Sequence, residues 1–95
     1  MTALPDLMLI SLNSLYMFEN NKAVDGCPLP KHGKPSKQPG SEQLLWLEQQ
    51  LLLARTRGMQ VYITGHVPPT EANWYRDCYT QYRELVLRFH DTVVG

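Results

Sequence analysis

The sequence predicts an α/β fold in which a βαβ unit is followed by a second helix and the beginning of a third strand. Three observations lead to this prediction: a short apolar run at residues 7–15, an amphipathic helix pattern that begins at Ser41, and a second apolar run at residues 59–64. Strand, helix and strand in this order, with a tight turn after the helix, form a crossover that makes the two strands parallel. A chain of 95 residues forms at most one small domain.

The first apolar run, LMLISLNSL, is nearly unbroken and is typical of a strand buried on both faces. Asn13 lies within it, and a polar residue there either serves chemistry or satisfies a neighbouring backbone group. Residues 19–40 then lose all periodicity and contain four prolines, three glycines and the basic string KHGKPSK. We expect a long surface loop there, of a length that is usually functional or disordered.

The helix that follows is marked at both ends. Ser41 is a good N-cap, and Gly58 supplies a left-handed stop after Arg55 and Arg57 in the last turn. The residues at helical spacing on the expected core face are Leu44, Leu47, Leu51 and Ala54. Further apolar residues widen this stripe, so we expect the helix to pack against something broad, such as a sheet. They are Leu45, Trp46, Leu52 and Leu53.

The second strand is expected at residues 59–64 and a second helix at about 74–90. Trp74, Tyr75, Tyr79 and Tyr82 could form a stacking platform, but core packing explains their helical spacing better. One face of that helix collects aromatic and apolar residues at helical spacing. The face comprises Tyr75, Cys78, Tyr82, Leu85 and Phe89. Residues 91–95, DTVVG, begin a third strand at the end of the sequence.

The overall charge excludes some classes of partner. Nine basic and nine acidic side chains give a formal net charge of zero, so no global field favours nucleic acid or an anionic membrane. The apolar runs are too short to span a bilayer, and residues 1–20 lack the features of a signal peptide. We therefore expect a soluble chain that does not bind nucleic acid.

The two cysteines, Cys27 and Cys78, are far apart and form no CxxC group, so neither a zinc knuckle nor a thioredoxin-type motif is indicated. They are either paired or two free thiols. A disulfide across this long loop would stabilise the fold by about 4 kcal/mol and would indicate an oxidising compartment.

His66 is the most informative candidate for chemistry. It follows directly on the second strand, where ligands gather in open α/β sheets, and Gly65 allows a sharp turn or a close approach of the backbone. Pro68 and Pro69 stiffen the exit. Such a histidine suits a metal ligand or a proton-transfer group, and the alternative is a histidine that caps the loop by hydrogen bonds.

Other polar residues are less specific. A cluster of ammonium groups at Lys31, Lys34 and Lys37 could attract phosphates, and the alternative is an ordinary solvated loop. For Asp25, Asp77 and His90 we favour solvated loop or helix positions. A site built on several metal ligands would need more candidates than these residues offer.

Residues 39–70 resemble calcineurin-like metallophosphoesterases. In that family a helix with the pattern W-L-x-x-Q-L, here WLEQQL, leads into a strand that ends in G-H-x-P-P, here GHVPP. The flanking blocks ISLNSLYMFENNKAVDGC and NWYRDCYTQYRELVLRFHDTVVG are closer to one branch, the fungal vacuolar endopolyphosphatases, and more distantly similar to acid sphingomyelinases. The resemblance implies that the βαβ unit, the second helix and the truncated strand are a fragment of the family's sandwich fold.

The resemblance also implies a function. The family uses a two-metal centre of divalent ions for hydrolysis, and His66 matches its metal-ligand histidine. The closer branch implies that inorganic polyphosphate is cut internally, on the lumenal side of the vacuole membrane, with a membrane anchor that this chain lacks. The alternatives are a phosphodiesterase of the sphingomyelinase-like branch and an inactive truncated remnant.

The match to the family is incomplete in one respect. The earlier metal motifs, Asp-x-His, Gly-Asp-x-x-Asp and Gly-Asn-His, are absent, and the later Gly-His motif would begin at Gly95. We therefore expect residues 1–95 to be the C-terminal-side part of a catalytic domain, with one ligand of a centre that needs several. We expect these residues alone to be inactive and only marginally stable.

Overall fold

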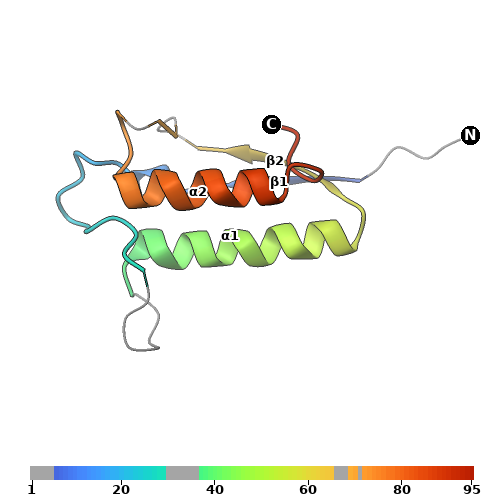
Figure 1. The fold of residues 1–95 in the computed structure, drawn as a ribbon, viewed down its shortest axis with the longest axis horizontal. Coiled ribbons are helices and arrows are strands. Elements are labelled where there is room, and N and C mark those ends of the chain that lie inside the picture. The colour runs from blue at the N-terminus through green and yellow to red at the C-terminus, as the bar shows by residue number, and fades with distance from the viewer. Residues whose placement is uncertain (1–5, 30–36, 66–68, 71) are drawn as a thin grey trace, which may run out of the picture.

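The computed structural model describes residues 6–29, 37–65, 69–70 and 72–95, and it confirms the α/β class. Two parallel strands, β1 (Leu7–Ser11) and β2 (Gln60–Thr64), are connected through helix α1 (Pro39–Thr56). A short 3₁₀ helix, η1 (Ser14–Tyr16), follows β1, and helix α2 (Arg76–Arg88) follows β2. The two helices run side by side, with both amino ends at the end of the molecule toward which the strands point (Figure 1).

The predicted beginning of a third strand is present as a short paired segment. Val61 donates to the carbonyl of Thr92 at 2.8 Å, and Val94 donates back to the carbonyl of Val61 at 2.9 Å. Val61 and Val93 thereby form an isolated parallel bridge. β2 thus has a neighbour on both edges, while in the described part of the chain β1 pairs only with β2.

The expectation of a first strand buried on both faces and running to Leu15 is wrong. β1 ends at Ser11, and Leu9 is 72% exposed although Ile10 beside it is buried. The register pairs Leu9 with Tyr62 on the outer face and Ile10 with Ile63 on the inner face. Only the inner face of the sheet contacts the helices. The packing of the helices therefore decides which alternate residues of the apolar run are buried.

Helix α1 corrects two further expectations. Its N-cap is Gln38 with Pro39 as the first helical residue, so Ser41 is not the cap; the Ser41 hydroxyl donates instead to the carbonyl of Pro28 at 3.0 Å. The core stripe is confirmed, because its four predicted residues are buried and lie in the main apolar cluster. The widened stripe is wrong, because the helix buries only one narrow face. The exposed apolar residues of α1 are Leu45, Trp46, Leu52 and Leu53.

The far ends of the two helices are joined by charged groups around an aromatic ring. The guanidinium groups of Arg55 and Arg88 lie 4.3 and 4.9 Å from the centre of the buried Phe89 ring. Arg55 also pairs with Asp91 at 2.7 Å, and Arg88 pairs with Glu48. The hydrogen bond from Arg55 lowers the pKa of the exposed Asp91 carboxyl. Exposed ion pairs of this kind contribute little to stability.

Gly58 ends the turn between α1 and β2 with a φ of +68°, as the sequence predicts. The second helix is shorter than expected at both ends, and of its predicted core face Cys78, Leu85 and Phe89 are buried. Among the described residues, no helix is both long and apolar enough to cross a bilayer.

Candidate functional site

The carboxyl ends of the two strands lie together because the strands are parallel and in register. Ser11 is the partner of Thr64, and one further ladder bond joins the Leu12 amide to the Thr64 carbonyl at 2.8 Å. The amino ends of α1 and α2 lie at the same end of the molecule (Figure 1). This is the edge at which open α/β sheets bind ligands, and His66 comes two residues after Thr64 in the chain.

Gly65 borders the turn that follows β1. A Cβ atom on Gly65 would be 3.3 Å from the Ser14 hydroxyl oxygen and 3.4 Å from the Ser14 Cβ. Ser14 is 1% exposed, so it has little room to move away. A Cβ at this position would be tight against Ser14, which favours glycine for close approach, one of the two reasons that the sequence suggested.

Asn13 is exposed and lies outside β1, in the turn that follows the strand. It is the backbone of Asn13 that is held: its N–H donates to Gln43 Oε1 at 2.5 Å, and Gln43 Nε2 donates to its carbonyl at 2.9 Å. The sequence pattern pointed to the Asn13 side chain and gave no indication of Gln43. A contact across 30 residues leaves no signal in the local pattern.

The other predicted site residues are placed only in part. His66, Lys31 and Lys34 lie outside the described residues. Lys37 is exposed and comes two positions before α1 begins. Of these four residues the structure describes Lys37 alone, so their grouping stays a prediction.

Cys27 and Cys78 form a disulfide, and neither is accessible to solvent. Of the two alternatives that the sequence left open, the structure has the bonded pair. The bond ties the loop after η1 to the first turn of α2. Gln81 Nε2 adds a hydrogen bond to the Cys27 carbonyl at 2.6 Å, and the Tyr75 hydroxyl lies 2.9 and 3.0 Å from the carbonyls of Asn21 and Val24. The part of the long loop at residues 19–29 is therefore firmly attached to α2.

Asp77 completes this attachment. Its Oδ1 accepts hydrogen bonds from the backbone N–H groups of Cys27 at 3.2 Å and Cys78 at 2.9 Å. Asp77 and the two sulfurs lie within 4.8 Å of one another, a spacing that would suit a metal ion. The sulfurs are bonded to each other, however, and a disulfide offers no thiolate to a metal. The expected metal centre therefore does not lie here.

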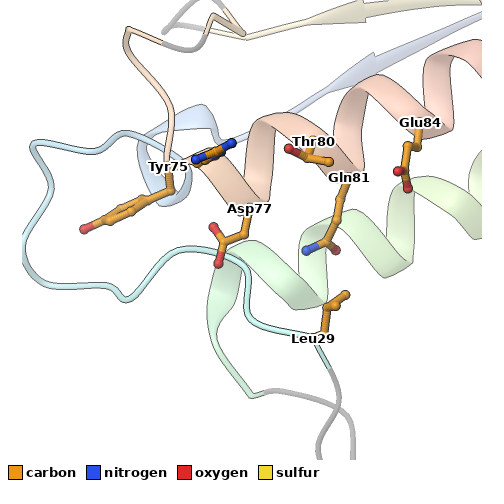
Figure 2. Close-up of a pocket in the computed structure, with 7 residues that line it drawn as sticks. Leu29, Tyr75, Asp77, Thr80, Gln81 and Glu84 are labelled. Carbon is orange, nitrogen blue, oxygen red and sulfur yellow. The ribbon is translucent and has the colours of Figure 1, made fainter.

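A groove of about 620 Å³ runs along α2 beside this loop (Figure 2). The carboxylates of Asp77 and Glu84 and the guanidinium of Arg76 provide its charges. Two acidic groups against one basic group give no surplus of positive charge to hold a polyanion. The groove is thus a poor candidate for a polyphosphate site. Its remaining lining residues are Leu29, Tyr75, Thr80 and Gln81.

Comparison with curated proteins gives matches over nearly the whole chain, although no protein-family profile matches it. An endopolyphosphatase of Schizosaccharomyces pombe is 44% identical over 93 residues, which is 97% of this chain and 15% of that protein. An endopolyphosphatase of Cryptococcus neoformans is 47% identical over 97% of this chain and 13% of its own length. The chain is similar to fungal endopolyphosphatases. The endopolyphosphatase of Saccharomyces cerevisiae, at 36% identity over 94% of the chain, agrees.

These matches confirm the resemblance to endopolyphosphatases that the motifs indicated. The matches cover only a small part of each relative, because the chain spans 12 to 15% of the length of the three endopolyphosphatases named above. The similarity therefore relates this chain to one segment of such proteins, and the activity of a whole endopolyphosphatase comes to it only as a proposal.

Proposed function

We propose that this chain is one part of an endopolyphosphatase, a hydrolase that cuts phosphoanhydride bonds within inorganic polyphosphate. The observation that carries the proposal is the identity of 44 to 47% with two proteins of that name over 97% of the chain. In this proposal residues 1–95 form the C-terminal-side part of the catalytic domain, and they contribute one histidine to its metal centre.

The fold supports this assignment in a specific way. Parallel sheets occur almost only with both faces covered. Here α1 and α2 cover one face, while on the other Leu7, Leu9 and Tyr62 are 51, 72 and 44% exposed. A second layer over this face would complete the calcineurin-like metallophosphoesterase sandwich that we propose for the complete protein.

His66 is the residue that we propose as a ligand of the divalent metal ions. An imidazole nitrogen at the carboxyl edge of the sheet suits this role. The described residues that border this edge, Asn13, Ser14 and Thr64, carry only neutral amide and hydroxyl oxygens, so a two-metal centre needs further ligands from other parts of the protein. When bound, the ions supply positive charge that neutralises the phosphoryl oxygens.

The disulfide supports a lumenal location for the complete protein. Bonded cysteine pairs persist in oxidising compartments and are rare in the cytosol. Cys27 and Cys78 are bonded and buried, which agrees with the proposal of the lumenal side of the vacuole membrane, with the anchor outside these residues.

The substrate class is tested with the purified complete protein and long-chain polyphosphate. We expect chains of intermediate length to appear early on a gel, because the cuts are internal. A chelator should abolish cleavage, and added divalent ions should restore it. Residues 1–95 alone should show no turnover. Release of single phosphates without intermediates, or faster hydrolysis of sphingomyelin than of polyphosphate, would contradict the proposal.

The lysine cluster is tested by changing Lys31, Lys34 and Lys37 together to Gln in the complete protein. Loss of three positive charges should raise the KM for polyphosphate roughly 3- to 10-fold at low salt, with a smaller change at high salt because ions screen exposed charges. The matched control changes the same residues to Arg, which retains the charge and should leave KM unchanged. Equal KM values for the Gln and Arg variants would show that the charges of these lysines do not contribute to polyphosphate binding.

A further inference from the structure

We infer that the outward face of α1 is a docking surface for an amphipathic helix from another part of the complete protein. This surface, the outer ridge, consists of the exposed side chains of Leu45, Trp46, Leu52 and Leu53. The inference rests on the proposal that this chain is one segment of a longer endopolyphosphatase. It assigns an internal contact of that protein, at a distance from the edge where we propose the metal centre.

The outer ridge is apolar where a surface helix is normally polar. Trp46 is 42% exposed, whereas the second tryptophan of the chain, Trp74, is 2% exposed. The opposite face of α1 is apolar as well and already packs in the core of the described residues. A helix that is apolar on both faces is typical of a position with neighbours on both sides. The buried residues of the core face are Leu44, Leu47, Leu51 and Ala54.

Helix α2 provides an internal comparison, because it lies beside α1 (Figure 1). Apart from Leu87, the exposed residues of α2 are all polar or charged, as expected for a helix that faces water. The two neighbouring helices therefore differ in their outward faces, and only α1 presents a surface for a partner. The exposed polar and charged residues of α2 are Arg76, Thr80, Arg83, Glu84 and Arg88.

The spacing within the outer ridge suits another helix. Leu45 and Leu52 are seven positions apart, and so are Trp46 and Leu53. Seven residues are close to two helical turns, so the members of each pair lie one above the other along α1. Gln49 is exposed and is three or four positions from all four residues, which places it at the centre of the ridge. Two apolar pairs around one central amide resemble a short helix–helix seam, in which the amide fixes the register.

The chemistry of this face favours a protein partner over a membrane surface. Helices that lie on membranes carry lysine and arginine beside their apolar face. The residues of α1 that share the outward face with the ridge are Glu42, Gln49 and Thr56, which carry no positive charge. A fitting partner helix has apolar residues at spacings of three, four and seven, and a basic residue opposite Glu42.

The length of the related proteins favours a partner within the same polypeptide. This chain spans 15 and 13% of the endopolyphosphatases of Schizosaccharomyces pombe and Cryptococcus neoformans, so most of such a protein lies outside the matched segment. A helix on the same polypeptide is present at a high effective concentration, which a second copy of the protein is not.

The test uses the complete protein, which is oxidised briefly with hydroxyl radicals and analysed by mass spectrometry of its peptides. The reactivity of each side chain is compared with its own reactivity in urea. We expect Trp46 in the folded protein to react about tenfold more slowly than in urea, because a closely packed helix excludes the reagent. Leu87 is the matched control on the outward face of α2, where it is 57% exposed, and it should retain most of its reactivity.

The partner is identified with Trp46→p-benzoylphenylalanine, which forms a covalent bond with its neighbour on illumination. We expect a cross-link within one polypeptide, to a helix outside residues 1–95. A cross-link between two polypeptides would indicate a second copy, and protection of Trp46 only with phosphatidylcholine vesicles would indicate a membrane surface. Unchanged reactivity of Trp46 in the folded protein, or equal protection of Leu87, would show that α1 has no partner of its own. Each of these four results would overturn the inference.

Polyphosphate cleavage by the same preparation separates this inference from the proposed function. Cleavage by a protein whose Trp46 is fully reactive would refute the docking surface and leave the function intact. A protected and cross-linked Trp46 in a folded protein that does not cleave polyphosphate would refute the function and leave the docking surface intact.

Discussion

Replacing Cys27 and Cys78 together by Ala is expected to lower the free energy of unfolding by about 4 kcal/mol. The bond closes a loop across a sequence separation of 51, and a cross-link of that span removes much conformational freedom from the unfolded chain. Small domains are stable by only about 5–15 kcal/mol, so this loss is a large fraction of the total. Because residues 1–95 alone are expected to be only marginally stable, urea denaturation of the complete protein measures the loss, for the oxidised wild type and for each variant.

The single variants Cys27→Ala and Cys78→Ala are the matched controls for the double change. If the cross-link is the source of stability, the single and double variants lose nearly the same free energy, because either change breaks the bond. Additive losses from two single variants would show that packing of the buried sulfurs dominates. Two free thiols in the oxidised wild-type chain would contradict the structure directly.

The elements of the fold were predictable because their signals are local. The spacing of Leu44, Leu47 and Leu51 identifies a helix from residues that are close in sequence. The end of the helix is likewise marked by one residue, Gly58, which adopts a positive φ. The parallel pairing followed from the order of the elements. The class, the order and the buried stripe of α1 were therefore available from sequence.

Exposure was not predictable where tertiary packing decides it. Leu9 and Ile10 look alike in sequence, and only the position of the helices makes one exposed and the other buried. Ser41 carries the right side chain for an N-cap, yet its hydroxyl is used by the Pro28 carbonyl, which a distant loop brings to it. Such long-range contacts override local propensity.

The candidate site was proposed from a motif, but the contacts of the neighbouring turn could not be predicted from the sequence. The position of His66 after β2 could be read from the sequence, as could the need for Gly65. Gln43 had no such signal, because its partner Asn13 is 30 residues away and only the backbone of Asn13 is bonded. Contacts between a side chain and a distant backbone do not depend on the partner's residue type, so the sequence does not record them.

His66→Ala is expected to have the largest effect on activity. Changes to residues that only support metal ligands typically cost about 10- to 100-fold in affinity or activity, so loss of a ligand itself should cost at least about 100-fold. His90 provides the matched control: it is an exposed histidine beyond the end of α2, with ring Nδ1 3.1 Å from the Leu87 carbonyl. His90→Ala removes the same chemical group from a surface position and should retain wild-type activity.

The most direct measurement is therefore the metal content of the complete protein together with its rate of polyphosphate cleavage, for the wild type, His66→Ala and His90→Ala. We predict that His66→Ala loses bound metal and turnover together, while His90→Ala retains both. Wild-type metal content and turnover in His66→Ala would contradict it, and would make His66 a loop-capping residue in a sheet whose chemistry lies elsewhere.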